Sequence, residues 1–316
     1  MGTSRGVETG DGVDAPSSSE PFHSRTVETR TLRMHVLEAG EGDDLVLCLH
    51  GFPELSYSWR HQLAPLAACG VRVWAPDLRG YGRTERPGRT RDYAIEALME
   101  DVDALIEAAG VPRATVIAHD WGGLVAWHFA MRYPERVARL GILNIPHPRV
   151  LLDHLIGPQF GALLYVLVFQ LPGVPERLLS ANEHRRIERA FTSIAVDPSR
   201  FDDADLERYR RAAAEPGALR AMLSYYRAYV RGGGMVRELW RGMPRIEAPT
   251  LMIWGARDPA LLTVSTEGTE RYVRGLTKRF IPNASHWVQQ EAPETVNAML
   301  TAWLRGERVP EASELG

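Results

Sequence analysis

The chain has 316 residues and a formal net charge of −3 at pH 7, with 45% hydrophobic and 24% charged residues. This is an ordinary globular composition, and the near-neutral charge gives no reason to expect nucleic acid or an anionic membrane as a partner. The chain has no run of about 18 apolar residues, so we expect no membrane-spanning helix.

The first residues and the cysteines bear on where the protein works. Residues 1–22 lack the apolar stretch of a signal peptide and are rich in Gly, Ser, Asp and Glu, which predicts a disordered tail.

Only Cys48 and Cys69 occur in this long chain, which favours a reduced, cytoplasmic protein. Neither lies in a pattern with metal-ligand spacing, and the ten histidines are scattered, so we expect no metal and no other cofactor.

The first predicted strands lead into a sharp turn. Two short extended segments between Arg25 and Glu38 are followed by a strongly apolar strand over residues 44–49. The next residues are His50-Gly51-Phe52-Pro53, and the bond before Pro53 is a candidate for the cis form, because cis peptide bonds are nearly confined to proline. We expect this turn to direct the backbone N–H of Phe52 toward a site at the end of the strand.

Strands and helices then alternate along the chain. The patterns predict helices over 56–68, 93–109 and 121–133, and strands over 71–75, 114–118 and 137–145. The Gly-rich loop 77–82 lacks the Lys-Ser/Thr ending of a phosphate-binding loop and is expected to be a turn. Such alternation is typical of βαβ units and a mainly parallel sheet.

The hydrophobic period changes from that of a strand to that of a helix at Asp120. Gly122 and Gly123 stand at the joint, where they permit a tight turn. Strand, tight turn and helix form a nucleophile elbow, which exposes one side chain at the carboxyl edge of the sheet. A carboxylate at that position can displace a leaving group from a saturated carbon and form an ester with the enzyme. The alternative is that Asp120 only caps the helix.

Hydrolysis of such an ester requires oxyanion donors and a base. The N–H of Trp121, next after the nucleophile, and that of Phe52 would form a two-donor oxyanion hole. Strands are also predicted over 250–254 and 278–281. Asp258 follows the first and His286 the second, so both are expected at the sheet edge that carries Asp120. The order nucleophile, acid, histidine is that of α/β-hydrolases, in which the acid orients the histidine and the histidine activates water.

A long helical insertion interrupts the alternation. Residues 150–242 contain no convincing strand, and helices are expected over 160–171, 176–191, 203–214 and 218–230. Beyond it we predict helices over 263–274 and 293–304. The sequence therefore predicts an α/β-hydrolase fold with a mostly parallel sheet flanked by helices. Its core domain would comprise residues 23–149 and 243–307, with a helical cap domain over 150–242 and a tail over 308–316. The cap helices also offer a face that a homodimer could use.

The phrases HGFPE, HDWGG, WGARDPAL and SHWVQQEAP together resemble the epoxide hydrolases of the α/β-hydrolase fold, and the similarity runs from about residue 24 to 305. This resemblance implies a carboxylate nucleophile, a His/Asp pair for ester hydrolysis and two cap tyrosines that hold the epoxide oxygen. On the same resemblance those tyrosines are Tyr165 and Tyr226. Tyr225 is less favoured, because adjacent helical residues point about 100° apart and only one can face the site.

The reaction implied is the conversion of an epoxide and water to a vicinal diol through an ester on Asp120, without a cofactor. Apolar side chains expected around the nucleophile predict a pocket for a lipophilic or aromatic epoxide. These side chains are Phe52, Trp121, Phe160, Leu163, Leu164 and Trp287.

Other functions fit fewer residues. Haloalkane dehalogenases share several of these phrases, but they need side-chain donors for the halide; Trp121 fits that role and Phe52 does not. A fluoroacetate-type dehalogenase would carry Arg at position 121, and a serine esterase would carry a Gly-x-Ser-x-Gly elbow. A ligand-binding protein on a retired hydrolase scaffold would not need the full set of Asp120, Asp258 and His286.

Overall fold

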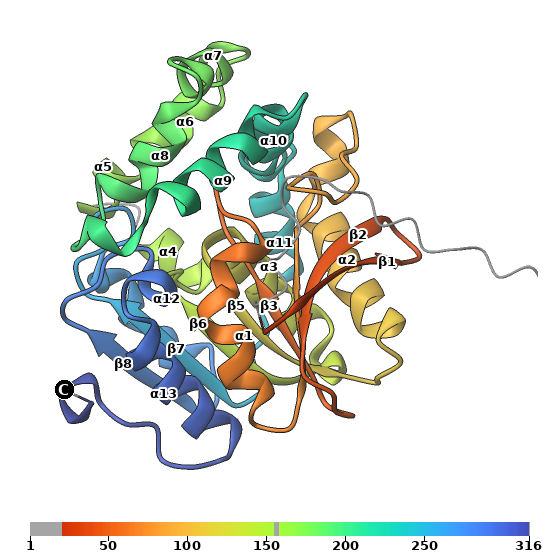
Figure 1. Ribbon diagram of the computed structural model, residues 1–316, viewed down its shortest axis with the longest axis vertical. Helices are drawn as coiled ribbons and strands as arrows, with labels where there is room; N and C mark the ends of the chain where they lie inside the picture. Colours follow the sequence, from red (N-terminus) through yellow and green to blue (C-terminus); the bar gives the residue numbers. More distant parts are fainter. Residues whose placement is uncertain (1–20, 155–157, 316) are drawn as a thin grey trace, which may run out of the picture.

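The computed structural model describes residues 21–154 and 158–315, built around one eight-stranded sheet (Figure 1). The strand order is β1-β2-β4-β3-β5-β6-β7-β8. Strand β2 pairs antiparallel with β1 and β4, and every other neighbouring pair is parallel. The strands are β1 (His23–Glu28), β2 (Arg33–Ala39), β3 (Leu45–Leu49), β4 (Arg72–Pro76), β5 (Ala114–His119), β6 (Val137–Leu143), β7 (Thr250–Gly255) and β8 (Leu276–Ile281). The predicted α/β-hydrolase fold is confirmed.

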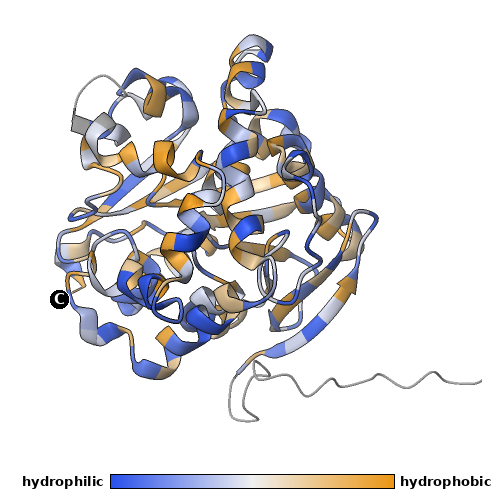
Figure 2. Ribbon diagram, turned by 90° about the horizontal axis from the view of Figure 1, so that it is seen from above, coloured by the Kyte–Doolittle hydropathy of each residue, from blue (hydrophilic) through white to orange (hydrophobic). Residues whose placement is uncertain are grey.

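Helices cover both faces of the sheet and bury its apolar strands. One face packs against α1 (Arg60–Ala67) and α13 (Pro293–Leu304), through side chains such as Leu63 and Leu300. The other packs against α2 (Ile95–Ala108) and α3 (Asp120–Arg132), through side chains such as Val102 and Val125. Strands β3 and β5 are buried along their whole length, as a parallel strand covered on both faces must be. Figure 2 shows strands in the middle of the molecule mainly in orange, with blue residues common on the surrounding helices.

The chain between β6 and β7 adds helices over one end of the sheet (Figure 1, α5 to α10 in green). They are α4 (Pro148–Asp153), α5 (Pro158–Ala162), α6 (Leu164–Phe169), α7 (Val174–Ser180), α8 (Arg185–Thr192), α9 (Asp203–Ala214), α10 (Ala218–Val230) and α11 (Gly234–Arg241). Within the described residues this connection contains no strand. We therefore propose that residues 150–242 form a cap domain on a core of residues 23–149 and 243–307.

Some helices predicted from the sequence are shorter or broken. The helix expected over 176–191 is interrupted at Asn182, Glu183 and His184, whose φ angles of 53°, 56° and 65° lie in the left-handed region. A right-handed helix cannot pass through three such residues. The helix expected over 160–171 is likewise divided into α5 and α6.

The prediction of an α-helix over 263–274 is wrong. The chain there forms two short 3₁₀ helices, Thr263–Thr266 and Thr269–Arg271. Between them Glu267 is extended and Gly268 has a φ of 86°, so the helical path is broken at that point.

The two predicted tails, residues 1–22 and 308–316, each contribute a buried side chain where the structure describes them. Residues 1–20 of the predicted N-terminal tail lie outside the described residues, and the Phe22 side chain is buried. At the other end Val309 is buried in the same apolar cluster as Phe22, and its carbonyl accepts hydrogen bonds from Arg279.

The turn into α3 leaves no room for a side chain at Gly122. A Cβ atom there would lie 2.5 Å from the carbonyl oxygen of Leu49 and 2.6 Å from that of His50, which are backbone atoms of the neighbouring strand end. We expect Gly122→Ala to lower the free energy of unfolding by about 3 kcal/mol, as overpacking of a close-packed interior does. Urea denaturation would measure this. Gly161→Ala is the matched control, because a Cβ there meets nothing within 4 Å and should leave stability nearly unchanged; an equal loss in both variants would contradict the steric explanation.

Candidate active site

Asp120 stands at the tight turn between β5 and α3. Its φ of 47° lies in the left-handed region, which is strained for a residue with a side chain. The neighbouring chain passes so close that a Cβ on Gly51 would lie 2.4 Å from the Asp120 Cβ. This geometry is that of the predicted elbow, and it directs the carboxylate out of the sheet edge into a cavity that Asp120 helps to line.

The turn after β3 supplies a backbone donor to this carboxylate. The peptide bond between Phe52 and Pro53 is cis, as the sequence suggested. The Phe52 N–H donates a hydrogen bond of 2.7 Å to Oδ1 of Asp120. Trp121 occupies the first turn of α3, where backbone N–H groups have no partner within the helix. Of the two groups named as oxyanion donors, the N–H of Phe52 thus contacts the carboxylate, and that of Trp121 follows Asp120 directly in the chain.

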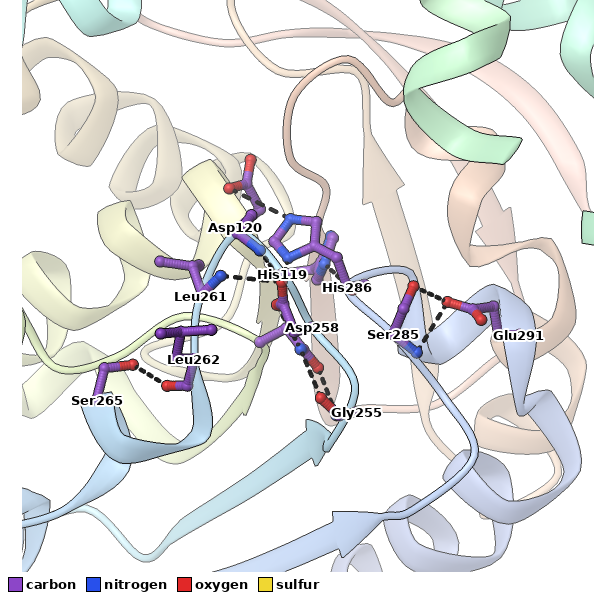
Figure 3. A network of polar contacts seen from close by, with 12 residues as sticks. His119, Asp120, Gly255, Asp258, Leu261, Leu262, Ser265, Ser285, His286 and Glu291 are labelled. Carbon is purple, nitrogen blue, oxygen red and sulfur yellow. Dashed lines mark hydrogen bonds and ion pairs between the residues drawn. The ribbon is translucent and has the colours of Figure 1, made fainter. Parts of the chain in front are cut away.

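His286 lies between two carboxylates (Figure 3). Its Nδ1 donates to Oδ2 of Asp258 over 2.7 Å, and its Nε2 lies 3.6 Å from Oδ2 of Asp120. The second oxygen of Asp258 accepts hydrogen bonds from the N–H groups of Ala260 and Leu261, at 2.8 and 2.9 Å. The structure thus brings together the three residues that the sequence placed at the ends of β5, β7 and β8.

Burial and the neighbouring charges shift the pKa values of both Asp120 and His286. Burial raises the pKa of Asp120, but the hydrogen bond and charge of His286 offset this, so the pKa stays below its ordinary value. Burial lowers the pKa of His286, yet the charges of Asp258 and Asp120 outweigh it and hold the pKa well above its usual range. Asp120 is therefore ionised and ready to attack, and the neighbouring charges favour the protonated form of His286.

Asn144 also contacts the acid, although no motif in the sequence marked it. It follows β6 directly, is fully buried and has a φ of 43°. Its Nδ2 donates to Oδ2 of Asp258 over 2.7 Å, and its Oδ1 accepts from the N–H of Gly255 over 2.8 Å. Asn144 thereby holds the loop after β7 in place. Its position at a strand end, like that of the catalytic residues, was the available signal.

A second histidine–carboxylate pair lies beneath His286. His119 Nδ1 donates to Oε2 of Glu54 over 2.7 Å, and its Nε2 donates to the carbonyl oxygen of His286 over 2.8 Å. Burial raises the pKa of Glu54, but the positive charge of His119 lowers it overall, so Glu54 is ionised. Both residues belong to the quoted phrases HGFPE and HDWGG, in which only their neighbours had been assigned roles.

Above Asp120 lies a cavity of about 380 Å³ between the sheet edge and the cap helices. Its wall is mostly aliphatic and includes Leu124, Ile145, Leu163, Leu164 and Leu261. Its polar side chains, besides Asp120, are Trp121 and three tyrosines. We conclude that the cavity suits an apolar molecule that meets polar groups mainly at the nucleophile.

Two of the three tyrosines are the ones chosen from the sequence. Tyr165 of α6 and Tyr226 of α10 both line the cavity, with ring centroids 6.2 Å apart. Burial raises the pKa of each hydroxyl well above its ordinary value, and the charge of Asp120 adds to this. Both therefore stay protonated and can donate hydrogen bonds. The third, Tyr229, was not selected; its hydroxyl lies 3.1 Å from Nε2 of the buried His128.

Tyr225 points away from the cavity. Its hydroxyl donates to the carbonyl oxygen of Arg79 over 2.8 Å, and its ring packs among Tyr81, Tyr93 and Trp121. Of the two adjacent tyrosines on α10, only Tyr226 faces Asp120.

The other residues expected around the substrate are placed differently. Trp121, Leu163 and Leu164 line the cavity. Phe52 and Trp287 are not among the lining residues: Phe52 packs edge-on against Tyr226 and Phe169, and Trp287 packs behind His286 against Phe191. Their contact with substrate stays a prediction, and the structure shows their rings against Tyr226 and His286 respectively. Phe160 lies in α5, but its side chain is outside the described part of the structure.

The described residues contain no group of three or more His, Cys, Asp or Glu arranged to hold a metal ion. In the same part of the chain no helix has both the length and the apolar character needed to cross a membrane.

The fold and site together define an α/β hydrolase with a carboxylate nucleophile, and comparison with known proteins agrees. The alpha/beta hydrolase fold family matches residues 44–293. The chain is 39% identical to AB hydrolase superfamily protein YfhM of Bacillus subtilis (strain 168) over 285 residues, 89% of this chain and 97% of that protein. It is 34% identical to epoxide hydrolase 4 of Mus musculus over 288 residues, 87% of this chain and 77% of that protein.

The similar solved structures are epoxide hydrolases. The crystal structure of epoxide hydrolase A from Mycobacterium thermoresistibile matches with a TM-score of 0.80 and 34% identity, over 92% of this chain and 100% of that one. Bacillus megaterium epoxide hydrolase in complex with an inhibitor matches with a TM-score of 0.81 and 30% identity, over 89% of this chain and 100% of that one. The chain belongs to the epoxide hydrolases of the α/β-hydrolase fold.

Proposed function

We propose that this protein hydrolyses a lipophilic or aromatic epoxide to a vicinal diol through an ester on Asp120. The observation that carries the proposal is the arrangement around one cavity: an ionised Asp120 in contact with His286, and the protonated hydroxyls of Tyr165 and Tyr226 in the same wall. An epoxide needs both, since a nucleophile opens the ring only if a donor receives the oxygen that leaves the carbon.

In the first half, the two oxygens of Asp120 have different roles. Oδ1 is held by the N–H of Phe52, so Oδ2 is the oxygen that attacks an epoxide carbon. The carbon–oxygen bond of the ring breaks as the new ester bond forms, and Tyr165 and Tyr226 donate to the oxygen as its charge grows. One well-placed donor of this kind typically contributes about 3 kcal/mol to transition-state stabilisation.

Ester formation also prepares the second half. It neutralises Asp120, so one of the two negative charges that raise the pKa of His286 disappears. His286 then releases its proton, which balances the proton taken up by the ring oxygen. The neutral imidazole is now a base, oriented by Asp258.

In the second half, water attacks the ester carbonyl and His286 accepts a proton from it. The negative charge develops on Oδ1, which already receives the N–H of Phe52 and would also meet that of Trp121. The acyl–oxygen bond breaks, the diol oxygen takes the proton from His286, and the regenerated carboxylic acid returns its own proton to the imidazole. The balance is one epoxide and one water consumed for each diol.

The location and assembly of the protein stay predictions. Cys48 and Cys69 are both free thiols, which supports our proposal that the protein works in the cytoplasm. A homodimer through the cap helices would be tested by sedimentation.

The test separates epoxide hydrolysis from dehalogenation. The protein is incubated with styrene oxide and, separately, with 1-bromobutane, while diol and bromide are assayed beside an Asp120→Asn variant. We expect diol without bromide, and no diol from the variant, because an amide is a far weaker nucleophile than a carboxylate. Bromide without diol would overturn the proposal in favour of a haloalkane dehalogenase, the candidate that Trp121 beside the nucleophile would suit.

A further inference from the structure

Large apolar side chains are exposed on one part of the molecule. Apart from Leu315, all those exposed in the described residues lie between positions 164 and 240. We call the members on α6, at the ends of α6 and α10, and on α11 the apolar rim: Leu164, Leu167, Val168, Leu171, Val230, Val236, Leu239 and Trp240. Exposed apolar residues that gather in this way usually mark a surface that binds something.

Three residues of the apolar rim also line the catalytic cavity. Leu164 and Leu167 of α6 and Val230 of α10 line the cavity and are also exposed, so the cavity reaches the surface beside these residues. Met235 of α11 lines it as well. The exposed apolar surface is therefore continuous with the wall of the cavity.

Helix α11 presents the most exposed part of the rim. Trp240 is 86% exposed and Val236 is 48% exposed, beside the exposed Leu239. A tryptophan is among the residues that are buried most on average, so such exposure is costly in water. Side chains of this kind on one short helix are typical of a helix that lies in the boundary between lipid and water.

The segment that contains α11 has more basic than acidic residues. Residues 231–245 contain a single acid, Glu238, whose side chain has no exposure and which binds Arg132 and Arg241. The same segment contains four arginines. Arg237 and Arg241 pair with Glu96 of α2, whereas the exposed Arg231 and Arg245 have no ion pair among the described residues. Arg231 and Arg245 therefore give this segment two exposed positive charges, although the whole chain has a net charge of −3.

We propose that the apolar rim binds the surface of an anionic lipid bilayer, with α11 lying in the interface. Trp240, Leu239 and Val236 would enter the headgroup boundary while Arg231 and Arg245 reach the lipid phosphates. Apolar epoxides concentrate in lipid, and the cavity opens where the lipid would lie, so substrate could pass from the bilayer to Asp120. A second copy of the chain on the same surface would instead cover that opening.

The test is flotation of the full chain with vesicles of phosphatidylcholine alone or mixed with phosphatidylglycerol. We expect the protein to float with the mixed vesicles, less with the neutral ones, and less again at high salt, which screens the arginines. Trp240→Ser should weaken partitioning roughly tenfold, the effect of about 1.4 kcal/mol, which is within what burial of one large apolar side chain contributes. Leu315→Ser is the matched control, because Leu315 is exposed outside the rim, and it should bind like the parent protein.

Hydrolysis of a water-soluble epoxide by Trp240→Ser should equal that of the parent protein, since Trp240 does not line the cavity. This readout shows that the variant is folded, and vesicle binding is measured whether or not the chain hydrolyses epoxides. Equal flotation of Trp240→Ser and the parent, or no flotation with either vesicle, would overturn the proposal. So would a dimer in ultracentrifugation that Trp240→Ser dissociates.

Discussion

Replacement of His286 by glutamine is expected to stop the reaction at the ester on Asp120. The nucleophile and the tyrosine donors remain, so the ring can still open, but no base is left to activate water. General-base removal of this kind typically lowers turnover by about 10²- to 10⁴-fold. Mass spectrometry of the intact His286→Gln variant after mixing with styrene oxide should show one adduct per chain.

The mass of that adduct distinguishes the reactions. An epoxide adds without losing an atom, so the protein should gain the whole mass of styrene oxide, and a His286→Gln, Asp120→Asn double variant should gain nothing. In the parent protein, turnover in ¹⁸O-labelled water should place label in the peptide that contains Asp120, because water attacks the ester carbonyl. Loss of turnover without any adduct in His286→Gln would mean that the histidine acts before or during ring opening and would contradict the two-step scheme.

Removal of the hydroxyls of Tyr165 and Tyr226 is expected to have the second largest effect. Each donates to an oxygen whose negative charge exists fully only as the ring opens, so each stabilises the transition state more than bound substrate. Tyr165→Phe and Tyr226→Phe should each lower the rate of ester formation by about 10²-fold, the usual effect of losing one such donor. The double variant should lose more, with kcat falling rather than KM rising.

The adjacent Tyr225 provides the control. Its hydroxyl bonds to the Arg79 carbonyl outside the cavity, so Tyr225→Phe should keep near-normal kcat and lose about 1 kcal/mol of unfolding free energy, the usual value of a hydrogen bond. Stopped-flow tryptophan fluorescence would follow ester formation, since Trp121 lies beside Tyr226 at a ring distance of 4.8 Å. If Tyr225→Phe lost as much activity as Tyr226→Phe, the assignment of the two tyrosines would be wrong.

The order of elements and the position of the catalytic group could be predicted from the sequence because both depend on local patterns. A short apolar run followed by helical spacing marked β5 and α3, and Asp120 stood where the period changed. Parallel strands have their carboxyl ends at one edge, so Asp258 and His286, each following a strand, had to meet Asp120. Tyr165 and Tyr226 were found through family resemblance, since periodicity alone does not separate a catalytic tyrosine from a core one.

Side-chain partners that lie far apart in the chain could be identified only from the tertiary structure. Asn144 bonds to Asp258, and Glu54 to His119, across 114 and 65 positions, and no local pattern records such pairings. Trp287 is a large apolar residue of the kind that often lines a pocket, but its ring packs against Phe191, behind His286. The total charge of the chain does not show that exposed apolar and positively charged residues lie together around α11. Sequence by itself determined which backbone elements form and which edge bears the chemistry; the packing of the cap on the core decided which side chains face the cavity, because side-chain direction depends on neighbours far away in the chain.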